Sequence, residues 1–223
     1  MKLGLIFDLD DTLYPEQSYN FSGFAAVGEY VLRHYSVPSF ATVCETLFKD
    51  GVRGDIFDRA AKRVGVTLPI ADLVSAYREH IPRIKLFEDA EWILDAVRGN
   101  FAMGLITDGY ASVQRKKVSA LGVADMFDSL VYSDDFGRMG WKPSDIPYRR
   151  TMTNLQSVAD HFVYIGDNPI KDFVTARSLG WKTVMVDRPT KIHRSNDVSR
   201  AHRADHTIKS LRDMPWAQLG VTR

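Results

Sequence analysis

The chain has 223 residues, enough for one substantial domain or for a core domain that carries a smaller inserted one. Its 29 Lys and Arg residues nearly balance its 28 Asp and Glu residues, and the net charge of +1 gives no electrostatic reason to expect nucleic acid or an anionic membrane as the main partner. The single cysteine, Cys44, cannot form an internal disulfide, and the apolar run at residues 4–7 is too short for a signal peptide or a membrane span. We therefore expect a cytoplasmic protein.

Five short apolar runs alternate with helical patterns along most of the chain. The runs cover residues 3–8, 102–107, 129–133, 162–166 and 183–187. They are mostly apolar, as expected of parallel strands whose two faces are both covered by helices. Helical patterns cover residues 88–98, 110–121 and 170–179, and the last two are followed by glycines suited to end a helix. This order predicts a Rossmann-like parallel sheet in a three-layer α/β/α fold.

Residues 14–86 interrupt the alternation, because they contain four amphipathic helical patterns and no convincing strand. We interpret this block as a helical cap subdomain inserted after the first strand and its turn, which leaves residues 1–13 and 87–223 for the core domain. The alternative is a set of extra helices packed on the sheet. Cys44 lies in one of the apolar helical patterns and is predicted to be a packed thiol. Residues 188–203, with five Arg or Lys and few apolar anchors, are predicted to form a solvated loop.

Polar residues that can carry chemistry stand where the predicted strands end. Because the carboxyl ends of parallel strands meet at one edge of a sheet, we expect these side chains to converge on one crevice. They are Asp8 and Asp10 after the first strand, Thr107 and Asp108 after the second, Lys142 in the connection after the third, and Asp167 and Asp172 after the fourth.

Several carboxylates in one partly buried crevice would repel one another strongly, and a hard divalent cation such as Mg²⁺ removes that difficulty. Thr107 and the backbone N–H groups that follow it, including that of Asp108, suit phosphate oxygens near the start of a helix. Lys142 adds a compact positive charge. Phosphoryl transfer mostly requires positioning and charge stabilisation, so the set predicts a magnesium-dependent phosphoryl-transfer site.

Two of the acids can divide the chemistry between them. Asp8 is expected to be ionised at neutral pH and needs no base to attack phosphorus. Asp10 can protonate the leaving oxygen, because neighbouring negative charges help it to keep a proton while a metal opposes them.

The sequence resembles the haloacid dehalogenase superfamily of hydrolases, over the core from residue 1 to about residue 187. All four motifs of that superfamily are present, and the helical insert resembles its C1-type cap. The matching residues are Asp8, Asp10 and Thr12 for Asp-x-Asp-x-Thr, Thr107 for the second motif, Lys142 for the third, and Gly166, Asp167 and Asp172 for the fourth.

The resemblance implies roles for these residues. Asp8 would become a transient aspartyl phosphate, Asp10 would act as general acid and then base, and Thr107 and Lys142 would hold the phosphoryl group. The Mg²⁺ ion would be bound by carboxylate oxygens of Asp8 and Asp167 and by the backbone carbonyl of Asp10. Asp172 would anchor the waters of the metal.

Asp10 also distinguishes branches of the superfamily, since dehalogenases and phosphonate hydrolases do not carry aspartate there. The resemblance therefore implies a phosphatase. Its substrate would be a small metabolite of the nucleotide monophosphate or sugar phosphate class, because a cap over the crevice would obstruct a folded protein substrate. Two alternatives stay open: a phosphomutase with the same core residues, and a non-catalytic phosphoacceptor module on the same fold.

Overall fold

The computed structural model describes residues 2–192 and 198–221 and contains two compact units. One unit consists of Met1–Glu16 and Lys85–Arg223, and the other of Gln17–Ile84. The sequence placed the insert at residues 14–86. Tyr14 belongs with the larger unit, where its side chain is fully buried, and the backbone N–H of Phe87 donates to the carbonyl of Leu13 at 2.9 Å.

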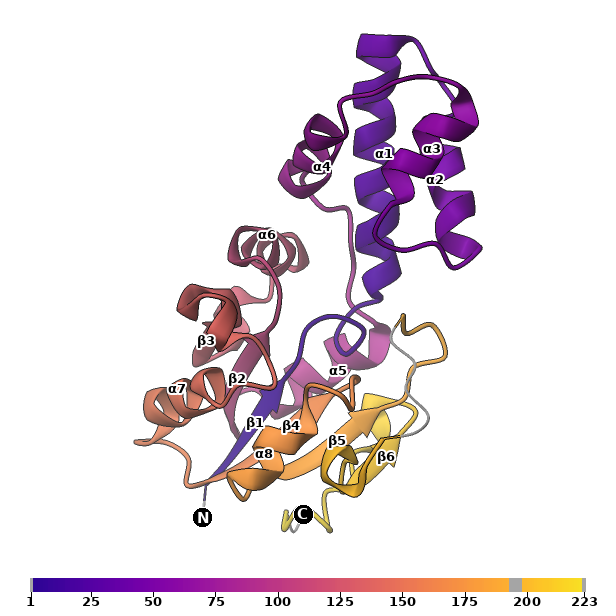
Figure 1. The fold of residues 1–223 in the computed structure, drawn as a ribbon. Helices are drawn as coiled ribbons and strands as arrows, with labels where there is room; N and C mark the ends of the chain where they lie inside the picture. Colours follow the sequence, from indigo (N-terminus) through magenta and orange to yellow (C-terminus); the bar gives the residue numbers. More distant parts are fainter. Residues whose placement is uncertain (1, 193–197, 222–223) are drawn as a thin grey trace. The chain divides into compact units, whose positions relative to one another are not determined.

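The larger unit is built on a six-stranded parallel sheet with the strand order β3-β2-β1-β4-β5-β6 (Figure 1). The five predicted strands are present with ends within one residue of those expected, so the predicted parallel α/β fold is confirmed. The strands are β1 (Leu3–Phe7), β2 (Ala102–Thr107), β3 (Ser129–Tyr132), β4 (His161–Gly166), β5 (Lys182–Val186) and β6 (His206–Ile208).

The strand β6 was not predicted. It has three residues, two of them polar, and therefore lacks the apolar run that marks the other strands. It pairs with β5 at the edge of the sheet, with Val184 opposite His206 and Val186 opposite Ile208. An edge position needs less apolar sequence because one side of the strand has no neighbouring strand.

Helices flank the sheet on both faces. In Figure 1, α7 (Ile146–Leu155) and α8 (Phe173–Ser178) lie in front of the sheet and α5 (Glu88–Val97) lies behind it. On the α7 and α8 side, a continuous apolar core joins Ile6 and Ile106 of the sheet to Tyr148 and Phe173 of these helices. The remaining helix, α6 (Ala111–Leu121), ends at Gly122, which adopts the left-handed conformation expected of a helix-ending glycine.

The helix α8 begins three residues later than residues 170–179 predicted. Asn168 organises the preceding turn: its side-chain oxygen accepts from the N–H of Ile170 at 3.1 Å, and its carbonyl accepts from the N–H groups of Lys171 and Asp172 at 3.1 and 3.0 Å. Local bonding of an asparagine side chain thus replaces the first helical turn. This turn carries Asp172 back toward the strand end.

The smaller unit consists of the four predicted helices, α1 (Glu16–Tyr35, which starts in the larger unit), α2 (Phe40–Lys49), α3 (Ile56–Val64) and α4 (Ile70–Glu79). Its core is aromatic, since the ring of Phe24 contacts those of Phe48, Phe57 and Tyr77. Cys44 is fully buried, and burial raises the pKa of its thiol to about 12, which agrees with a packed thiol. Within residues 2–192 and 198–221, no helix has the length and apolar content that crossing a bilayer requires.

The prediction of a solvated loop at residues 188–203 is wrong at its start. Arg188 is buried and pairs with Asp89 at 2.7 Å, while it also donates to the carbonyl of Thr12 at 3.0 Å. Lys191 is buried and pairs with Asp187 at 3.0 Å. A charge pattern alone does not reveal such partners, because Asp89 is 99 residues away in the sequence. Residues 193–197 lie outside the described part of the chain.

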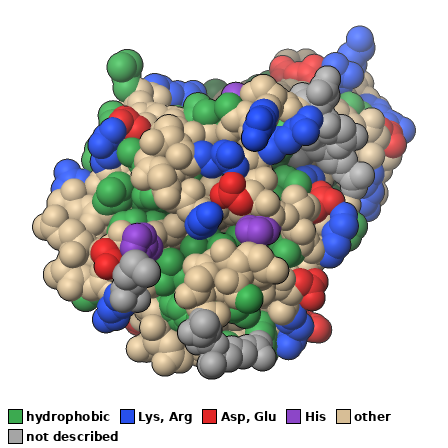
Figure 2. Space-filling model, turned by 90° about the horizontal axis from the view of Figure 1, so that it is seen from below, with side chains coloured by type: hydrophobic (Ala, Val, Ile, Leu, Met, Phe, Trp, Pro, Cys, Tyr) green, Lys and Arg blue, Asp and Glu red, His purple; other side chains and the backbone are tan. Residues whose placement is uncertain are grey.

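The two ends of the sheet differ in character. At the amino ends of the strands, Lys2, His161 and Lys182 line a shallow hollow of about 450 Å³, and Figure 2 shows basic, acidic and apolar side chains interspersed on this face. The acids and the lysine singled out in the sequence all lie at the carboxyl ends.

Candidate active site

The site begins at the end of β1, which lies between β2 and β4 in the centre of the sheet. The chain leaves β1 toward β2 on one side and returns to β4 on the other, so a crevice opens at the point where the strand order reverses. Asp8 follows β1 directly, and its backbone N–H donates to the carbonyl of Ile165 on β4 at 2.8 Å. The sheet thereby fixes the position of Asp8 beside the end of β4, where Asp167 stands.

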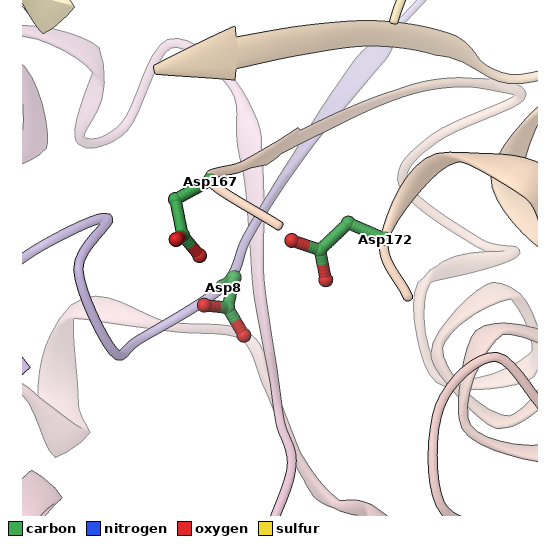
Figure 3. A group of neighbouring side chains, drawn as sticks. All are labelled: Asp8, Asp167 and Asp172. Carbon is green, nitrogen blue, oxygen red and sulfur yellow. The ribbon is translucent and has the colours of Figure 1, made fainter. Parts of the chain in front are cut away.

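Three carboxylates meet in this crevice and form what we call the acidic cluster: Asp8, Asp167 and Asp172 (Figure 3). One oxygen from each lies within 4.8 Å of the others, and all three residues are at most 5% exposed. Asp167 Oδ2 is buried and has no hydrogen-bond partner among the described residues. An unpartnered carboxylate oxygen in an acidic, buried cluster fits a hard divalent cation, which takes carboxylate oxygens as ligands.

The protonation of the acidic cluster reflects the same crowding. Burial raises the pKa of Asp8 to about 7; the Lys142 ammonium opposes the rise and the Asp172 carboxylate adds to it. Burial, and then the charges of Asp172 and Asp8, also hold the pKa of Asp167 well above its usual range. A divalent cation would remove this penalty on the charged forms, so electrostatics favours the same ligand as geometry does.

Lys142 is the buried positive charge of the crevice. Its Nζ lies 2.5 Å from Asp8 Oδ1 and 2.7 Å from Asp172 Oδ1, and it donates to the Tyr164 hydroxyl at 3.0 Å. Burial lowers the pKa of Lys142, but the charges of Asp172 and Asp8 outweigh it and hold the pKa above its usual range. Lys142 is therefore a charged group that bridges two of the three acids.

Asp108 holds the loop that carries Lys142. Asp108 Oδ1 accepts from the backbone N–H of Lys142 at 2.9 Å and from the Ser133 hydroxyl at 2.7 Å, and Oδ2 accepts from Lys171 Nζ at 2.8 Å. These donors hold the pKa of Asp108 below its usual value although burial alone would raise it. A phosphate contact by Asp108 would therefore use its backbone N–H, since both carboxylate oxygens already accept hydrogen bonds.

Asp10 stands apart from the acidic cluster, among groups that donate. Its Oδ1 accepts from Lys117 Nζ at 2.6 Å and from the Tyr14 hydroxyl, and its Oδ2 accepts from Gln114 Nε2 at 3.1 Å. We call Tyr14, Gln114 and Lys117 the donor cluster. Both Asp10 oxygens accept from this donor cluster, and neither belongs to the acidic cluster, so a metal contact of Asp10 would use its backbone carbonyl.

Thr107 is linked to Asp10 through the donor cluster. It is 1% exposed, and its hydroxyl donates to Gln114 Oε1 at 3.0 Å. A hydroxyl has one hydrogen, so donation to a phosphate oxygen would require rotation away from Gln114. The turn that follows Asp10 is fixed by Asp11, which adopts a left-handed backbone with φ of 53° and accepts from the N–H groups of Glu16 and Ile192 at 2.9 and 2.7 Å.

The sequence interpretation missed the donor cluster, although α6 carries a signal for it. Val113, Lys117 and Leu121 follow helical spacing, as do Gln114 and Val118, and all but Leu121 are buried. Two polar residues on the inward stripe of an amphipathic helix indicate buried polar contacts. The sequence alone does not say which group they would contact.

The crevice itself is small, about 70 Å³, and is lined by the acidic cluster, Asp10, Lys142 and Lys171, with Glu16 at its side. Pockets that enclose a drug-sized ligand usually measure ~300–1,000 Å³, so this crevice suits one compact polar group. Burial and the charge of Asp10 raise the pKa of Glu16 to about 8, which makes it a further acid that the sequence interpretation did not single out.

Fold and site together define an α/β protein with a buried acidic cluster, a buried lysine and a candidate cation site at the switch point of its sheet. The chain belongs to the haloacid dehalogenase-like hydrolase family, whose model matches residues 5–186. The Thr107, Lys142 and Asp167 positions all lie within this match.

Two curated relatives match nearly the whole chain. The ribulose-1,5-bisphosphate 5-phosphatase of Halopiger xanaduensis is 27% identical over 96% of this chain and 98% of its own. The glyceraldehyde 3-phosphate phosphatase of Methanocaldococcus jannaschii is 27% identical over 95% of this chain and 94% of its own. These relatives, together with the family, make the chain a phosphoric monoester hydrolase of the haloacid dehalogenase type.

Among solved structures, the L-2-haloacid dehalogenase of Xanthobacter autotrophicus has a TM-score of 0.66 at 18% identity, with all of both chains covered. This likeness concerns the fold alone. Since one fold carries both dehalogenases and phosphatases, the likeness to this structure does not decide the reaction.

Proposed function

We propose that this phosphatase hydrolyses small-molecule phosphate monoesters with Mg²⁺, through a phosphorylated Asp8. One observation carries the proposal: Asp8 is paired with Lys142 at 2.5 Å inside the acidic cluster, while a second acid, Asp10, stands beside it in a separate environment. A nucleophile and an acid in different surroundings are what two-step phosphoryl transfer requires.

In the first step, a carboxylate oxygen of Asp8 attacks phosphorus and the bond from phosphorus to the ester oxygen breaks. Asp10 gives its proton to that oxygen, so the product leaves as an alcohol. Lys142 stabilises negative charge on the phosphoryl oxygens, and the rotated Thr107 hydroxyl and the N–H of Asp108 add hydrogen bonds to them. The deprotonated Asp10 is left ready for the second step.

In the second step, Asp10 takes a proton from water and the water oxygen attacks phosphorus. The bond from phosphorus to Asp8 breaks, which releases inorganic phosphate and restores the Asp8 carboxylate. The same residue therefore acts as acid and then as base, and each cycle returns Asp10 to its protonated form.

The residues that would hold Mg²⁺ are Asp8 and Asp167 through carboxylate oxygens, Asp10 through its backbone carbonyl, and Asp172 through the waters of the ion. The orphan Oδ2 of Asp167 supports this assignment. When bound, the ion would supply positive charge that keeps Asp8 ionised and offsets charge on the phosphate.

For the substrate, we propose a small phosphorylated metabolite of the sugar phosphate or nucleotide monophosphate class, handled in the cytoplasm. The named relatives support the sugar phosphate half of this range, since they are phosphatases of ribulose-1,5-bisphosphate and of glyceraldehyde 3-phosphate. A further relative is the phosphoserine phosphatase of Thermus thermophilus, 28% identical over 72% of this chain and 64% of its own.

The test is a panel of phosphorylated metabolites with Mg²⁺, in which free phosphate and the organic product are both measured. Asp8→Asn is expected to reduce phosphate release to background, because an amide cannot form the acyl phosphate. Asp125→Asn, at an exposed position outside the crevice, is the matched control and keeps wild-type turnover. Full activity in Asp8→Asn contradicts the mechanism. An isomerised sugar phosphate would indicate a mutase instead, and stable labelling of Asp8 without release would indicate a phosphoacceptor module.

A further inference from the structure

The surroundings of Asp10 specify which of its two oxygens handles the proton. A carboxylate offers about two acceptor sites on each oxygen. Among the hydrogen bonds of the described residues, Oδ1 accepts two, from Lys117 and Tyr14, and Oδ2 accepts one, from Gln114. The acceptor position of Asp10 that stays available is therefore on Oδ2.

Three contacts orient the Gln114 amide, and the two made by Nε2 still hold it, and with it Asp10, once the Thr107 hydroxyl has turned to a phosphate. Its Oε1 accepts from the Thr107 hydroxyl at 3.0 Å, while its Nε2 donates to Asp10 Oδ2 at 3.1 Å and to the carbonyl of Asp108 at 3.0 Å. A flipped amide would turn its oxygen toward the Asp108 carbonyl and the Asp10 carboxylate, leaving oxygen against oxygen. The amide thus donates to two acceptors and accepts from one donor, and its bonds to Thr107 and Asp108 join Asp10 to the end of β2.

Stability alone does not explain a buried lysine at position 117. Its side chain is 4% exposed, and removing an ammonium from water has a large desolvation cost that nearby carboxylates only partly offset. An apolar side chain of similar length could fill the same inward position of α6. The pairing with Asp10 at 2.6 Å therefore points to a role in orienting that carboxylate.

We propose that Lys117 and Gln114 are positioning residues, which hold Asp10 so that Oδ2 faces the leaving oxygen and then the attacking water. The proposal rests on the proposed function. Lys117 and Gln114 lie three residues apart on α6, so one rigid helix sets both oxygens of the acid. Loss of either contact lets the carboxylate turn and slows only the steps that need its proton.

The test compares two kinds of leaving group. An alkyl phosphate needs a proton on its leaving oxygen, whereas p-nitrophenyl phosphate releases a stable phenolate without one. In Lys117→Met we expect kcat/KM for the alkyl ester to fall about 100-fold and that for p-nitrophenyl phosphate to stay within about threefold of wild type. Gln114→Met should show the same selective loss, to a smaller degree.

Controls separate positioning from folding. Arg115→Gln lies on the same helix and removes an exposed pair with Asp135 and a stacking contact with the Tyr132 ring, neither of which lines the crevice, so both kcat/KM values should stay at wild-type level. Asp10→Asn removes the acid itself, so its loss of kcat/KM for the alkyl ester relative to p-nitrophenyl phosphate is the largest that the positioning variants can show. If Lys117→Met does not fold, Gln114→Met alone decides.

Three outcomes count against the inference: equal loss on both esters, which marks a structural role; no loss on either; or a loss in Lys117→Met that Asp10→Asn does not share. If the wild type releases phosphate from neither ester, the proposed function itself fails, and this result is distinct from all three.

Discussion

Asp8 and Asp10 are two residues apart in the sequence, yet their carboxylates lie in opposite surroundings. Asp8 belongs to the acidic cluster, where Lys142 is shared between two acids and an oxygen of Asp167 has no partner among the described residues. Asp10 belongs with the donor cluster, where three side chains donate to one acid. In the acidic cluster one buried lysine, Lys142, faces three acids, whereas in the donor cluster Lys117 pairs with Asp10.

One short loop therefore places two acids in surroundings that suit different chemical roles. A cation stabilises most the carboxylates whose negative charge is not balanced by nearby positive groups. It adds little to a carboxylate whose oxygens already accept hydrogen bonds. The backbone after β1 turns through the left-handed Asp11, so successive acids point to different neighbours.

Removing the divalent cation should have the largest effect. With a chelator in excess, phosphate release is expected to fall to background, because the acidic cluster would then confront the phosphate with uncompensated negative charge. Added Mg²⁺ should restore turnover, which a phosphate-release assay measures directly. Full activity in the chelator would mean that Lys142 alone balances the acids.

Asp10→Asn should come next. General acid–base groups typically contribute about 10²–10⁴-fold, and kcat for an alkyl phosphate should fall by that order. Mg²⁺ affinity, measured by calorimetry, should stay near wild type, because the Asp10 contact with the metal is assigned to its backbone. A large loss of Mg²⁺ affinity would place the Asp10 carboxylate with the acidic cluster after all.

Asp167→Asn should show the reverse pattern. Its orphan oxygen is assigned to the cation, so Mg²⁺ affinity should fall by about 10–100-fold and activity should recover partly at high Mg²⁺. Activity against Mg²⁺ concentration, compared with Asp125→Asn, measures this shift. An unchanged Mg²⁺ dependence would remove Asp167 from the metal site.

The contrast between the two clusters also explains how far sequence alone could reach. The acidic cluster was predictable because its members follow strands β1 and β4, and parallel strands bring their carboxyl ends together whatever the details. The donor cluster was not, because its contacts depend on how α6 is rotated against the strand ends. Gln114 and Lys117 stood on the inward stripe of the helix, but the stripe does not name Asp10 as their partner.

Other parts of the chain show the same difference between features that follow from local sequence and contacts that depend on packing. The four helices of the insert followed from periodicity, since apolar spacing is a local signal. The buried pair of Arg188 with Asp89 did not, because it joins a charged tail to a helix 99 residues earlier. The strand β6 was too short and polar to be noticed, and the late start of α8 depends on one asparagine side chain.

The smallest expected effect concerns stability without metal. The pKa of Asp8 rises from 3.8 to about 7 on folding, so the folded chain retains a proton that the unfolded chain releases between about pH 4 and 7. Stability of the metal-free protein should therefore decline as pH rises through this window, and the raised pKa of Asp167 acts in the same direction. We expect a Tm lower at pH 8 than at pH 5 by on the order of 5 °C in the presence of a chelator.

Two comparisons attribute that decline to the acidic cluster. Saturating Mg²⁺ should stabilise the protein more at pH 8 than at pH 5, because the cation favours the charged acids. Asp8→Asn removes one of the acids whose pKa is raised and should reduce the decline, whereas Asp125→Asn should leave it unchanged. A decline that persists in Asp8→Asn would assign it to another acid, and Glu16, whose pKa is raised to about 8 beside Asp10, is the next to substitute.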